Sequence, residues 1–481
     1  MAAAKNLTIL QINDTHGYIQ EHWEHFFDGD HSKYVRAGGY PRMSAYFEQV
    51  RKERKDQVLV LDGGDTFHGT YPVVKTKGEV LIPFLNDMKI DAMTAHWEFA
   101  YGPERLNQLL ESLSYPMLAI NIYHKGTKDL AYKPYLIKEV NGIKVGIIGI
   151  ASTIVDKVMP ASFSEGLYFT LGNEELPHFI REVKELGADL LVVLSHLGYP
   201  QDLKLAEEVD GIDVLLSAHT HNRVYEPAII NGAVVIQSGC HGSFVGRLDL
   251  TIDDKKVSGF NHQLVLLDET IKENTQMKQG IEKAMLPYKE ELERQVGTTG
   301  TDPNRNPVLE STMDNLLLQS LLHLTMADIA FSNGWRYGAP IPKGKITEND
   351  LWNIIPVNPP VSTVQLTGKE VWDMMEENLE RTFAANPYEQ MGGYVKRAFG
   401  LNLYFKFENP FGERVQELFI DGKPVIKDKV YQAAFVTSQG VPQKYGKNRQ
   451  NIDTHAIDAL KEYLKEYPEA DCDLRGSVVA V

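Results

Sequence analysis

Apolar runs that end in metal-binding side chains are the feature that most limits the fold of this chain. Five such runs lie in its first half: "LTILQI", "VLVLDGG", "IDAMTA", "LLVVLS" and "VLLSA". In open α/β sheets the ligand site lies beyond the carboxyl ends of the strands, so we expect these side chains to converge on one crevice. In chain order they are Asp14 and His16, Asp65, His96, His196, and His219 and His221.

Taken together, these residues indicate a metal site. A single histidine or aspartate at a strand end is usually a turn former or a satisfied polar group. Only 15 histidines occur in 481 residues, however, and five of them lie in or next to these strand ends. The set offers oxygen and nitrogen ligands and no thiolate, which suits Mn²⁺, Zn²⁺, Fe or Co better than Ca²⁺.

The number of ligands favours two ions over one. Seven ligands exceed what one tetrahedral ion takes, so we expect two divalent ions, Mn²⁺ or Zn²⁺, bridged by a shared carboxylate. Ions ~3.5–4 Å apart lower the pKa of a bridging water to ~7 and clamp the oxygens of an in-line displacement. The chemistry expected is therefore hydrolysis by a metal-bound hydroxide, most often at phosphorus.

The order of apolar runs predicts an α/β protein of two domains. Residues 1–268 alternate strand-like and helix-like stretches, and Asn141-Gly142 and Asn231-Gly232 lie between apolar runs as hairpin turns do, so the sheet is predicted to be mixed. Residues 269–299 are charged and helix-favouring and are interpreted as a connecting helix, kinked by Pro287. Residues 300–481 form a second α/β domain with a hairpin at Asp421-Gly422.

Composition excludes several classes of function. The formal net charge of −16 argues against a nucleic-acid polymer as partner, and no apolar run approaches the ~20 residues of a membrane span. A small anionic substrate is still expected if metal ions supply a local positive field. Cys240 and Cys472 indicate no disulfide framework, although one long-range bridge stays open. The start "MAAAKNLTIL" carries no signal peptide, so a cytoplasmic location is expected unless an export signal was removed. Oligomeric state is not indicated.

Five motifs resemble a known family. "NDTHG", "GGDTFHG", "TAHWEFAYG", "LSHLG" and "SAHTH" occur in the order and approximate spacing of the 5′-nucleotidase family of dinuclear metallophosphoesterases. The resemblance implies an N-terminal four-layer α/β metallophosphatase domain with mixed sheets, a connecting helix and a C-terminal substrate-binding domain. It also implies a division of the ligands: Asp14, His16 and His221 hold one ion, His96, His196 and His219 hold the other, and Asp65 bridges them.

The third motif departs from the family pattern. The family reads Gly-Asn-His-Glu-Phe-Asp-Tyr-Gly where this chain reads Ala-His-Trp-Glu-Phe-Ala-Tyr-Gly. His96 replaces the metal-binding asparagine, and Trp97 and Ala100 replace the catalytic His–Asp pair. Since tryptophan has only an indole N–H and cannot titrate, no general acid stands at this position.

Other histidines are candidates for the missing acid. His22, His25 and His31 lie in "EHWEHFFDGDH", an insertion after the first motif that is expected to overhang the site, and His68 follows the bridging aspartate. The alternative for each is a flexible surface histidine.

The substrate side contains both matches to the family and departures from it. Tyr394 and Phe435 match the aromatic clamp of nucleotidases, although either could be a core residue. Arg336 and Arg381 match substrate-binding arginines, and Arg397 could reach an anion or be solvated. "HWEFAYG", "SNGWRYG" and "NPYEQMGGYVKRAFGL" look more like the thiosulfohydrolase branch of the family, which cleaves a protein-bound cysteine S-sulfonate.

The sequence therefore predicts a metal-dependent hydrolase, with phosphomonoesters or nucleotides as the first substrate class. Thiosulfohydrolase-like cleavage of a sulfur ester is the alternative, motivated by Trp97 and Ala100. An inactive, metal-bearing binding protein is a third possibility, favoured by the lost His–Asp pair and opposed by the full ligand set.

Overall fold

The computed structural model describes residues 4–392 and 394–481, and the chain divides into two compact units. The first unit contains Met1–His22 and Arg36–Leu286, and the second contains Trp23–Val35 and Pro287–Val481. The first unit thus extends past residue 268, where the sequence placed the end of the first domain, and a short segment near the N-terminus groups with the second unit.

Two sheets build the first unit. One has five strands in the order β15-β14-β1-β4-β5, and the other has six in the order β12-β13-β11-β10-β8-β7. Both combine parallel and antiparallel neighbours: β1 runs parallel to β4 and antiparallel to β14, and β8 runs parallel to β10 and antiparallel to β7. The mixed sheets confirm the predicted fold class. The strands are β1 (Lys5–Ile12), β4 (Val58–Asp62), β5 (Ala92–Met93), β7 (Tyr135–Val140), β8 (Ile143–Ile150), β10 (Leu190–Ser195), β11 (Val214–Leu216), β12 (Ala228–Ile230), β13 (Ala233–Ile236), β14 (Phe244–Asp253) and β15 (Lys256–Leu266).

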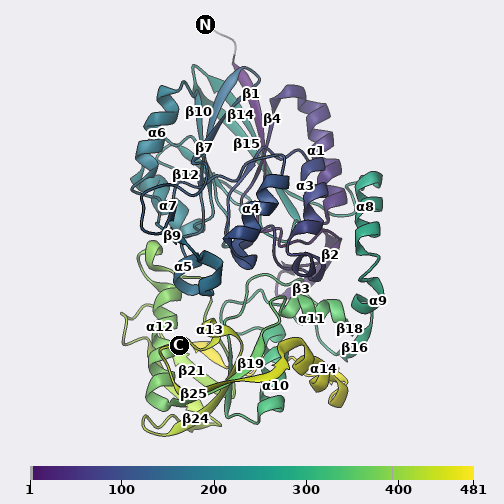
Figure 1. Cartoon of the computed structure of the whole chain (residues 1–481), viewed down its shortest axis with the longest axis vertical. Helices are drawn as coiled ribbons and strands as arrows, with labels where there is room; N and C mark the ends of the chain where they lie inside the picture. Colours follow the sequence, from purple (N-terminus) through teal and green to yellow (C-terminus); the bar gives the residue numbers. More distant parts are fainter. Residues whose placement is uncertain (1–3, 393) are drawn as a thin grey trace. The chain divides into compact units, whose positions relative to one another are not determined.

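The apolar strands are buried because both faces of each sheet are covered. Ile9 of β1 and Val192 of β10 belong to one core cluster formed by both sheets. The other face of the six-stranded sheet packs against helices α6 (Leu176–Glu185) and α7 (Tyr199–Glu208). Helix α1 (Tyr40–Arg54) contacts β4 and α8 (Thr275–Met285). Figure 1 shows α6 and α7 to one side of the strands and α1 and α8 to the other, which gives four layers.

All three predicted hairpin turns are present. Asn141-Gly142 joins β7 to β8, Asn231-Gly232 joins β12 to β13, and Asp421-Gly422 joins β22 (Val415–Ile420) to β23 (Lys423–Pro424). Both central residues of each turn have positive φ, for example 51° and 68° at Asn141 and Gly142. Asn, Asp and Gly tolerate this left-handed backbone, which a two-residue hairpin loop requires.

The segment expected to connect the domains is helical in two pieces. Helix α8 begins after Asn274, whose side chain accepts a hydrogen bond of 3.0 Å from the Met277 N–H. It ends at Met285, and α9 (Lys289–Leu292) follows. Pro287 lies in the gap between the two helices. Proline has no backbone N–H and therefore interrupts the hydrogen bonds of a continuous helix.

The insertion at residues 21–31 differs from the overhanging loop that was expected. It lies mostly in a two-stranded sheet of β2 (His22–Asp28) and β3 (His31–Ala37). Residues 23–35 group with the second unit, where the Tyr34 hydroxyl donates to the Asp302 carbonyl at 3.1 Å. Aromatic and polar residues do not alternate strictly in "HWEHFFD", so the segment lacks the period of two that identifies a strand.

The second unit has its own core. A five-stranded sheet β20-β17-β24-β19-β25 and a four-stranded sheet β23-β22-β21-β27 share buried residues with helix α12, while a small sheet has the order β18-β16-β26. Capping boxes start α11 at Thr347 and α12 at Thr367. The elements are α10 (Thr312–Thr325), α11 (Glu348–Ile354), α12 (Gly368–Phe383), α14 (Ala456–Glu466), β16 (Gln295–Thr299), β17 (Ile329–Ser332), β18 (Gly344–Thr347), β19 (Pro360–Thr367), β20 (Arg397–Phe399), β21 (Leu401–Phe405), β24 (Val430–Phe435), β25 (Lys447–His455), β26 (Glu469–Ala470) and β27 (Val478–Ala480).

Two further predictions concern the chain as a whole. Within the described residues, no helix combines the length and apolarity needed to cross a membrane. Neither Cys240 nor Cys472 is in a disulfide.

Candidate metal centre

The structure brings all seven sequence-predicted ligands together in the first unit. They form two groups, and within each group one ligand atom from every residue lies within 4.8 Å of the others. Asp65 belongs to both groups, as a bridging carboxylate would. One group is Asp65, His96, His196 and His219, and the other is Asp14, His16, Asp65 and His221.

Strand topology explains this convergence. Asp14 and His16 follow β1, Asp65 follows β4 and His96 follows β5, and these three strands are parallel neighbours. The remaining histidines follow β10 and β11, which are parallel neighbours in the other sheet. Parallel strands present their carboxyl ends at one edge, so the two sheets deliver their ligands to the same region.

The ligand-bearing loops have an unusual backbone. Five of the seven residues have positive φ: 50° at Asp14, 47° at His16, 59° at Asp65, 72° at His219 and 58° at His221. A left-handed conformation is uncommon for residues other than glycine and costs of order 1–3 kcal/mol when it is strained. Such strain persists where the surrounding structure demands it, which is typical of functional sites.

The nitrogen and oxygen atoms of the predicted ligands lie close to one another. Nε2 of His16 and Nε2 of His221 are 3.3 Å apart. Nε2 of His196 lies 3.2 Å from Asp65 Oδ2, and Nδ1 of His96 lies 3.1 Å from Asp65 Oδ1. The ligand atoms thus cluster in two places, and a divalent cation in each place would be coordinated by their lone pairs.

Nε2 of His96 is a buried ligand atom that makes no hydrogen bond or ion pair with any described residue. Oδ1 of Asp14 and Nε2 of His196 meet only other ligand residues, at 3.2 Å from Nε2 of His221 and Oδ2 of Asp65. A buried polar atom without a partner is costly, and functional groups that await an ion or ligand are one explanation. The donor set therefore fits two divalent metal ions.

Backbone carbonyls orient two of the imidazoles. Nδ1 of His16 donates to the His68 carbonyl at 3.1 Å, and Nδ1 of His196 donates to the Gly63 carbonyl at 2.5 Å. Because a carbonyl oxygen only accepts, Nδ1 of each ring carries a proton, which leaves Nε2 as the nitrogen that faces the site. Glycine is required at position 63, because a Cβ there would lie 2.7 Å from that of Asn13 and 2.9 Å from that of Ala218.

Burial governs the ionisation of the ligands. It raises the pKa of Asp14 to about 6 and lowers the pKa of His16 to about 3. Burial also opposes the charge of Asp65, but attraction to His96 and His196 outweighs it and holds the pKa of Asp65 well below its usual value. The shared aspartate therefore stays ionised, as a bridge between two cations requires.

Trp97 forms an apolar wall at the position where the family resemblance predicts a catalytic histidine. Its backbone N–H donates to Asp65 Oδ1 at 2.8 Å, so the residue is adjacent to the centre. Its ring stacks on His68 with centroids 4.6 Å apart and contacts Phe163 edge-on at 6.1 Å. Only 7 % of Trp97 is exposed, so its indole is held by packing.

Two of the candidate acids lie in the first unit, and both are buried. Nε2 of His22 forms a hydrogen bond of 3.0 Å with the Ser243 hydroxyl, and the His68 ring stacks on Trp97. Burial lowers the pKa of His68 to about 3, so this imidazole is neutral at pH 7. The surface-histidine alternative is wrong for both, because strand and turn packing cover them.

The other two candidates lie in the second unit. His25 is buried, with Nε2 2.9 Å from the Ser32 hydroxyl, so the surface alternative is wrong here as well. His31 has a side chain that is 83 % exposed and pairs with Asp30 at 3.2 Å. For His31 the surface interpretation agrees with the structure.

A further histidine, His241, lies beside the centre and was not among the sequence-predicted residues. Its backbone N–H donates to the Asp14 carbonyl at 2.7 Å, and its ring lies 6.2 Å from that of His221 and 4.7 Å from that of Tyr18. It is buried and has φ of 59°. His241 follows β13 as the other histidines follow their strands, so the same strand-end rule could have found it.

In the second unit, Tyr394 lies among arginines. The guanidinium carbon of Arg336 lies 4.8 Å from the centre of the Tyr394 ring, and that of Arg397 lies 5.6 Å from it. Arg397 is almost fully buried, with Nε 3.1 Å from Asp314 Oδ2 and Nη2 donating to the Pro307 carbonyl at 2.7 Å. The solvated alternative for Arg397 is therefore wrong, because an ion pair holds it inside.

The remaining substrate-side candidates lie in different environments. Phe435 is 3 % exposed, belongs to the core cluster of the second unit, and has the Arg449 guanidinium 4.7 Å from its ring centre. Arg381 is 46 % exposed and pairs with Glu377 at 2.7 Å. Phe435 thus has little free face for stacking, and Arg381 is a solvated helix residue in this conformation.

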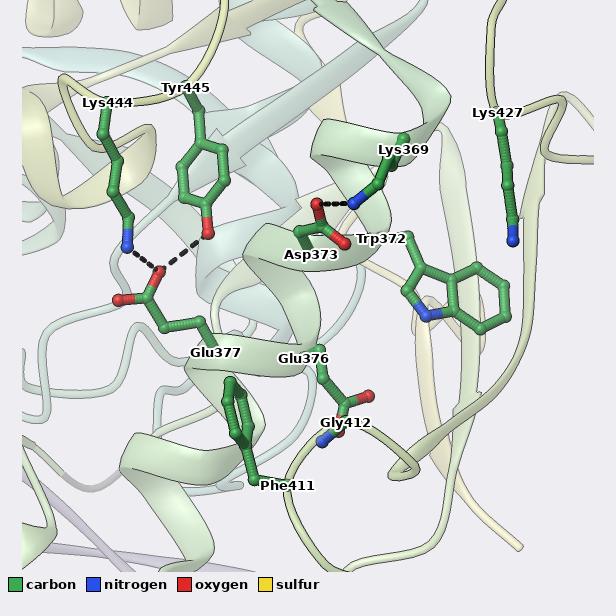
Figure 2. A pocket seen from close by; sticks show the side chains of 10 residues that line it. All are labelled: Lys369, Trp372, Asp373, Glu376, Glu377, Phe411, Gly412, Lys427, Lys444 and Tyr445. Carbon is green, nitrogen blue, oxygen red and sulfur yellow. Dashed lines mark hydrogen bonds and ion pairs between the residues drawn. The ribbon is translucent and has the colours of Figure 1, made fainter.

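A hollow of about 440 Å³ lies on one face of α12 (Figure 2). Most of its charged side chains are paired with one another: Glu377 accepts from the Lys444 ammonium at 2.7 Å and from the Tyr445 hydroxyl at 2.8 Å, and Lys369 pairs with Asp373. Glu376 accepts from backbone N–H groups, including that of Val415 at 2.8 Å. These contacts describe a satisfied surface network.

Comparison with known proteins adds independent information. Residues 293–437 match the family model described as the 5′-nucleotidase, C-terminal domain. The trifunctional nucleotide phosphoesterase protein YfkN of Bacillus subtilis is 27 % identical over 469 residues, which cover 86 % of this chain and 30 % of that protein. The 5′-nucleotidase of Homo sapiens is 26 % identical over 466 residues, which cover 87 % of this chain and 78 % of the human protein.

Solved structures share the fold over the whole chain. The sulfate thiohydrolase SoxB of Thermus thermophilus, solved with glycerol, has a TM-score of 0.92 at 24 % identity and covers 99 % of this chain and 96 % of its own. A 5′-nucleotidase precursor from Thermus thermophilus has a TM-score of 0.87 at 24 % identity, with 99 % of both chains covered. With the motifs of the first unit and the family match of the second, these findings support the resemblance of the chain to the 5′-nucleotidase family of metallophosphoesterases.

Proposed function

We propose that this chain is a dinuclear-metal-dependent hydrolase of small anionic esters, with phosphomonoesters as the first substrate class. The observation that carries this proposal is the pair of four-residue groups that share Asp65. Similarity to relatives that are named 5′-nucleotidases and phosphoesterases supports it.

The residues of the first unit divide the work. Asp14, His16 and His221 would hold one ion, His96, His196 and His219 the other, with Asp65 shared. Divalent ions, when bound, activate water and neutralise charge that develops on the substrate. The carbonyls of His68 and Gly63 keep the imidazoles of His16 and His196 in the tautomer that leaves Nε2 available.

No titratable side chain occupies position 97 or 100 to protonate a leaving group. Trp97 and its stacking partner His68 instead form a wall of two neutral rings, since burial lowers the pKa of His68 to about 3. Leaving groups that depart without a proton, such as nitrophenolate, are therefore expected to react faster than nucleosides.

A substrate panel tests the proposal. p-Nitrophenyl phosphate and AMP would be assayed with Mn²⁺, Zn²⁺ and Co²⁺ in turn, with Asp65→Ala as the metal-site control. We expect turnover of p-nitrophenyl phosphate by the wild type and none by the variant. Absence of phosphate release with every metal would overturn phosphomonoester hydrolysis.

Sulfur-ester hydrolysis is a second candidate, and the position of Trp97 favours it. A thiol has a pKa near 8.5 and leaves as a thiolate far more readily than an alcohol leaves as an alkoxide, so it needs no general acid. Water attack on an S-sulfonate breaks the S–S bond and yields the thiolate and sulfate. Sulfate released from S-sulfocysteine, measured beside the phosphate assays, would identify this activity, and its absence would remove the candidate.

A further inference from the structure

Asp202 is a buried carboxylate near the metal centre that belongs to neither ligand group. It lies in the first turn of α7 and is 0 % exposed. Its backbone N–H donates to the Gly198 carbonyl at 2.8 Å, which fixes it to the helix start. Both side-chain oxygens accept hydroxyl groups at 2.6 Å, Oδ1 from Ser195 and Oδ2 from Ser217.

The two serines end the strands that carry metal ligands. Ser195 is the last residue of β10 and directly precedes His196, and Ser217 follows β11 on the way to His219. Strands β10 and β11 are parallel neighbours, so Asp202 bridges their carboxyl ends. His196 and His219 belong to the same ligand group, together with Asp65 and His96.

The direction of these hydrogen bonds is set by their surroundings. The Leu197 N–H donates to Ser195 Oγ at 3.2 Å, and Nε2 of Gln237 donates to Ser217 Oγ at 3.0 Å. Each hydroxyl therefore already receives a hydrogen bond and turns its own proton to Asp202. Asp202 is therefore the acceptor on both sides, with one side-chain oxygen for each serine.

We propose that Asp202 is a positioning residue for the ion site formed by Asp65, His96, His196 and His219. By holding the ends of β10 and β11 at a fixed separation, it sets the distance between two of the imidazoles in this group. This inference rests on the proposed metal site. It extends that proposal to a residue that would touch neither the ions nor the substrate.

The chain offers a matched control at the opposite end of the same strands. Asp213 precedes β11, and its Oδ2 accepts the Leu191 N–H of β10 at 2.8 Å. It links the same two strands at their amino ends, away from the ligand loops. Asp213→Ala should reduce stability without moving the histidines, which separates positioning from general loss of structure.

The test measures Mn²⁺ binding to the full chain by calorimetry and by electron paramagnetic resonance, with thermal melting to verify folding. We expect Asp202→Ala to weaken the binding of one of the two ions by about 10- to 100-fold, which is the range for residues that hydrogen-bond metal ligands and hold them in place. Asp202→Asn should have a smaller effect, because its oxygen still accepts from one serine. Asp213→Ala should bind both ions as the wild type does.

Three outcomes would overturn the inference. These are a folded Asp202→Ala with wild-type affinity for both ions, an equal loss in Asp213→Ala, and a wild type that binds no Mn²⁺. Should Asp202→Ala fail to fold, Ser195→Ala and Ser217→Ala remove the two bonds singly, and wild-type affinity in both would also contradict it. A wild type that binds two ions with the expected variant effects but hydrolyses no ester would refute the proposed function and leave Asp202 in its role.

Discussion

The candidate residues of the two units differ in how they are placed. In the first unit, seven residues far apart in sequence meet in two groups, because each follows a strand whose carboxyl end lies at the same edge. In the second unit, the five substrate-side candidates lie in unlike environments, from the core position of Phe435 to the exposed helix face of Arg381. Topology makes strand-end residues converge, but it imposes no such rule on residues taken from helices and loops.

The motifs of the two units also differ in how much they specify about each residue. A motif in the first unit names both the residue type and its place at a strand end, so two independent requirements select it. In the second unit, a matched position specifies only an aromatic or an arginine. Whether that side chain faces solvent, a ligand or the core depends on packing, as Phe435 and Arg397 show.

Removing the shared ligand is the largest test of the first unit. Asp65→Ala should abolish ester hydrolysis and release at least one ion, because both groups lose a carboxylate together. Metal content and phosphate release would be measured together, with Glu207→Ala on the exposed face of α7 as the control. Binding function that persists without metal would instead favour an inactive binding protein.

Restoring the family's acid is the second test. Trp97→His with Ala100→Asp should raise turnover of AMP by about 10²- to 10⁴-fold, the usual contribution of general acid catalysis. The gain should be smaller for p-nitrophenyl phosphate, whose leaving group needs no proton. An unchanged rate with both substrates would show that the missing pair does not limit this enzyme.

Two arginines test the second unit. Arg336→Ala should raise KM by about 10- to 100-fold, since a hydrogen bond to a charged group is worth about 1.5–3 kcal/mol. Arg381→Ala should change KM less than about threefold, because Arg381 is 46 % exposed and paired with Glu377. The KM of each variant would be measured by steady-state kinetics with an ester that the wild type hydrolyses. Equal effects of the two substitutions on KM would mean that side-chain exposure in this conformation does not predict substrate binding.

The smallest effect is expected at Phe435. Phe435→Leu should lower the free energy of unfolding by about 1 kcal/mol through looser packing and leave KM for AMP unchanged. Denaturant titration and kinetics would be run on the same preparation. A base-stacking role predicts the reverse pattern, since stacking contributes about 1–3 kcal/mol per base.

Much of the fold was predictable because local rules determined it. The hairpins at Asn141-Gly142, Asn231-Gly232 and Asp421-Gly422 need positive φ at both central residues, and few residue types allow this. The hairpin β2–β3 was not predicted, because the many histidines and acidic residues of "EHWEHFFDGDH" leave it without a strict strand periodicity. His241 was not predicted either, since it lies outside the five motifs that carry the predicted ligands.

The sequence by itself determined which donor groups meet in the two clusters and that no titratable side chain stands at positions 97 and 100. Those properties depend on residue type at strand ends, where the backbone leaves little choice of direction. Only the tertiary structure decided that Phe435 and Arg397 are buried, that Trp97 stacks on His68, and that Asp202 joins two ligand-bearing strands. Each of these depends on contacts between residues distant along the chain, and no local pattern encodes such contacts.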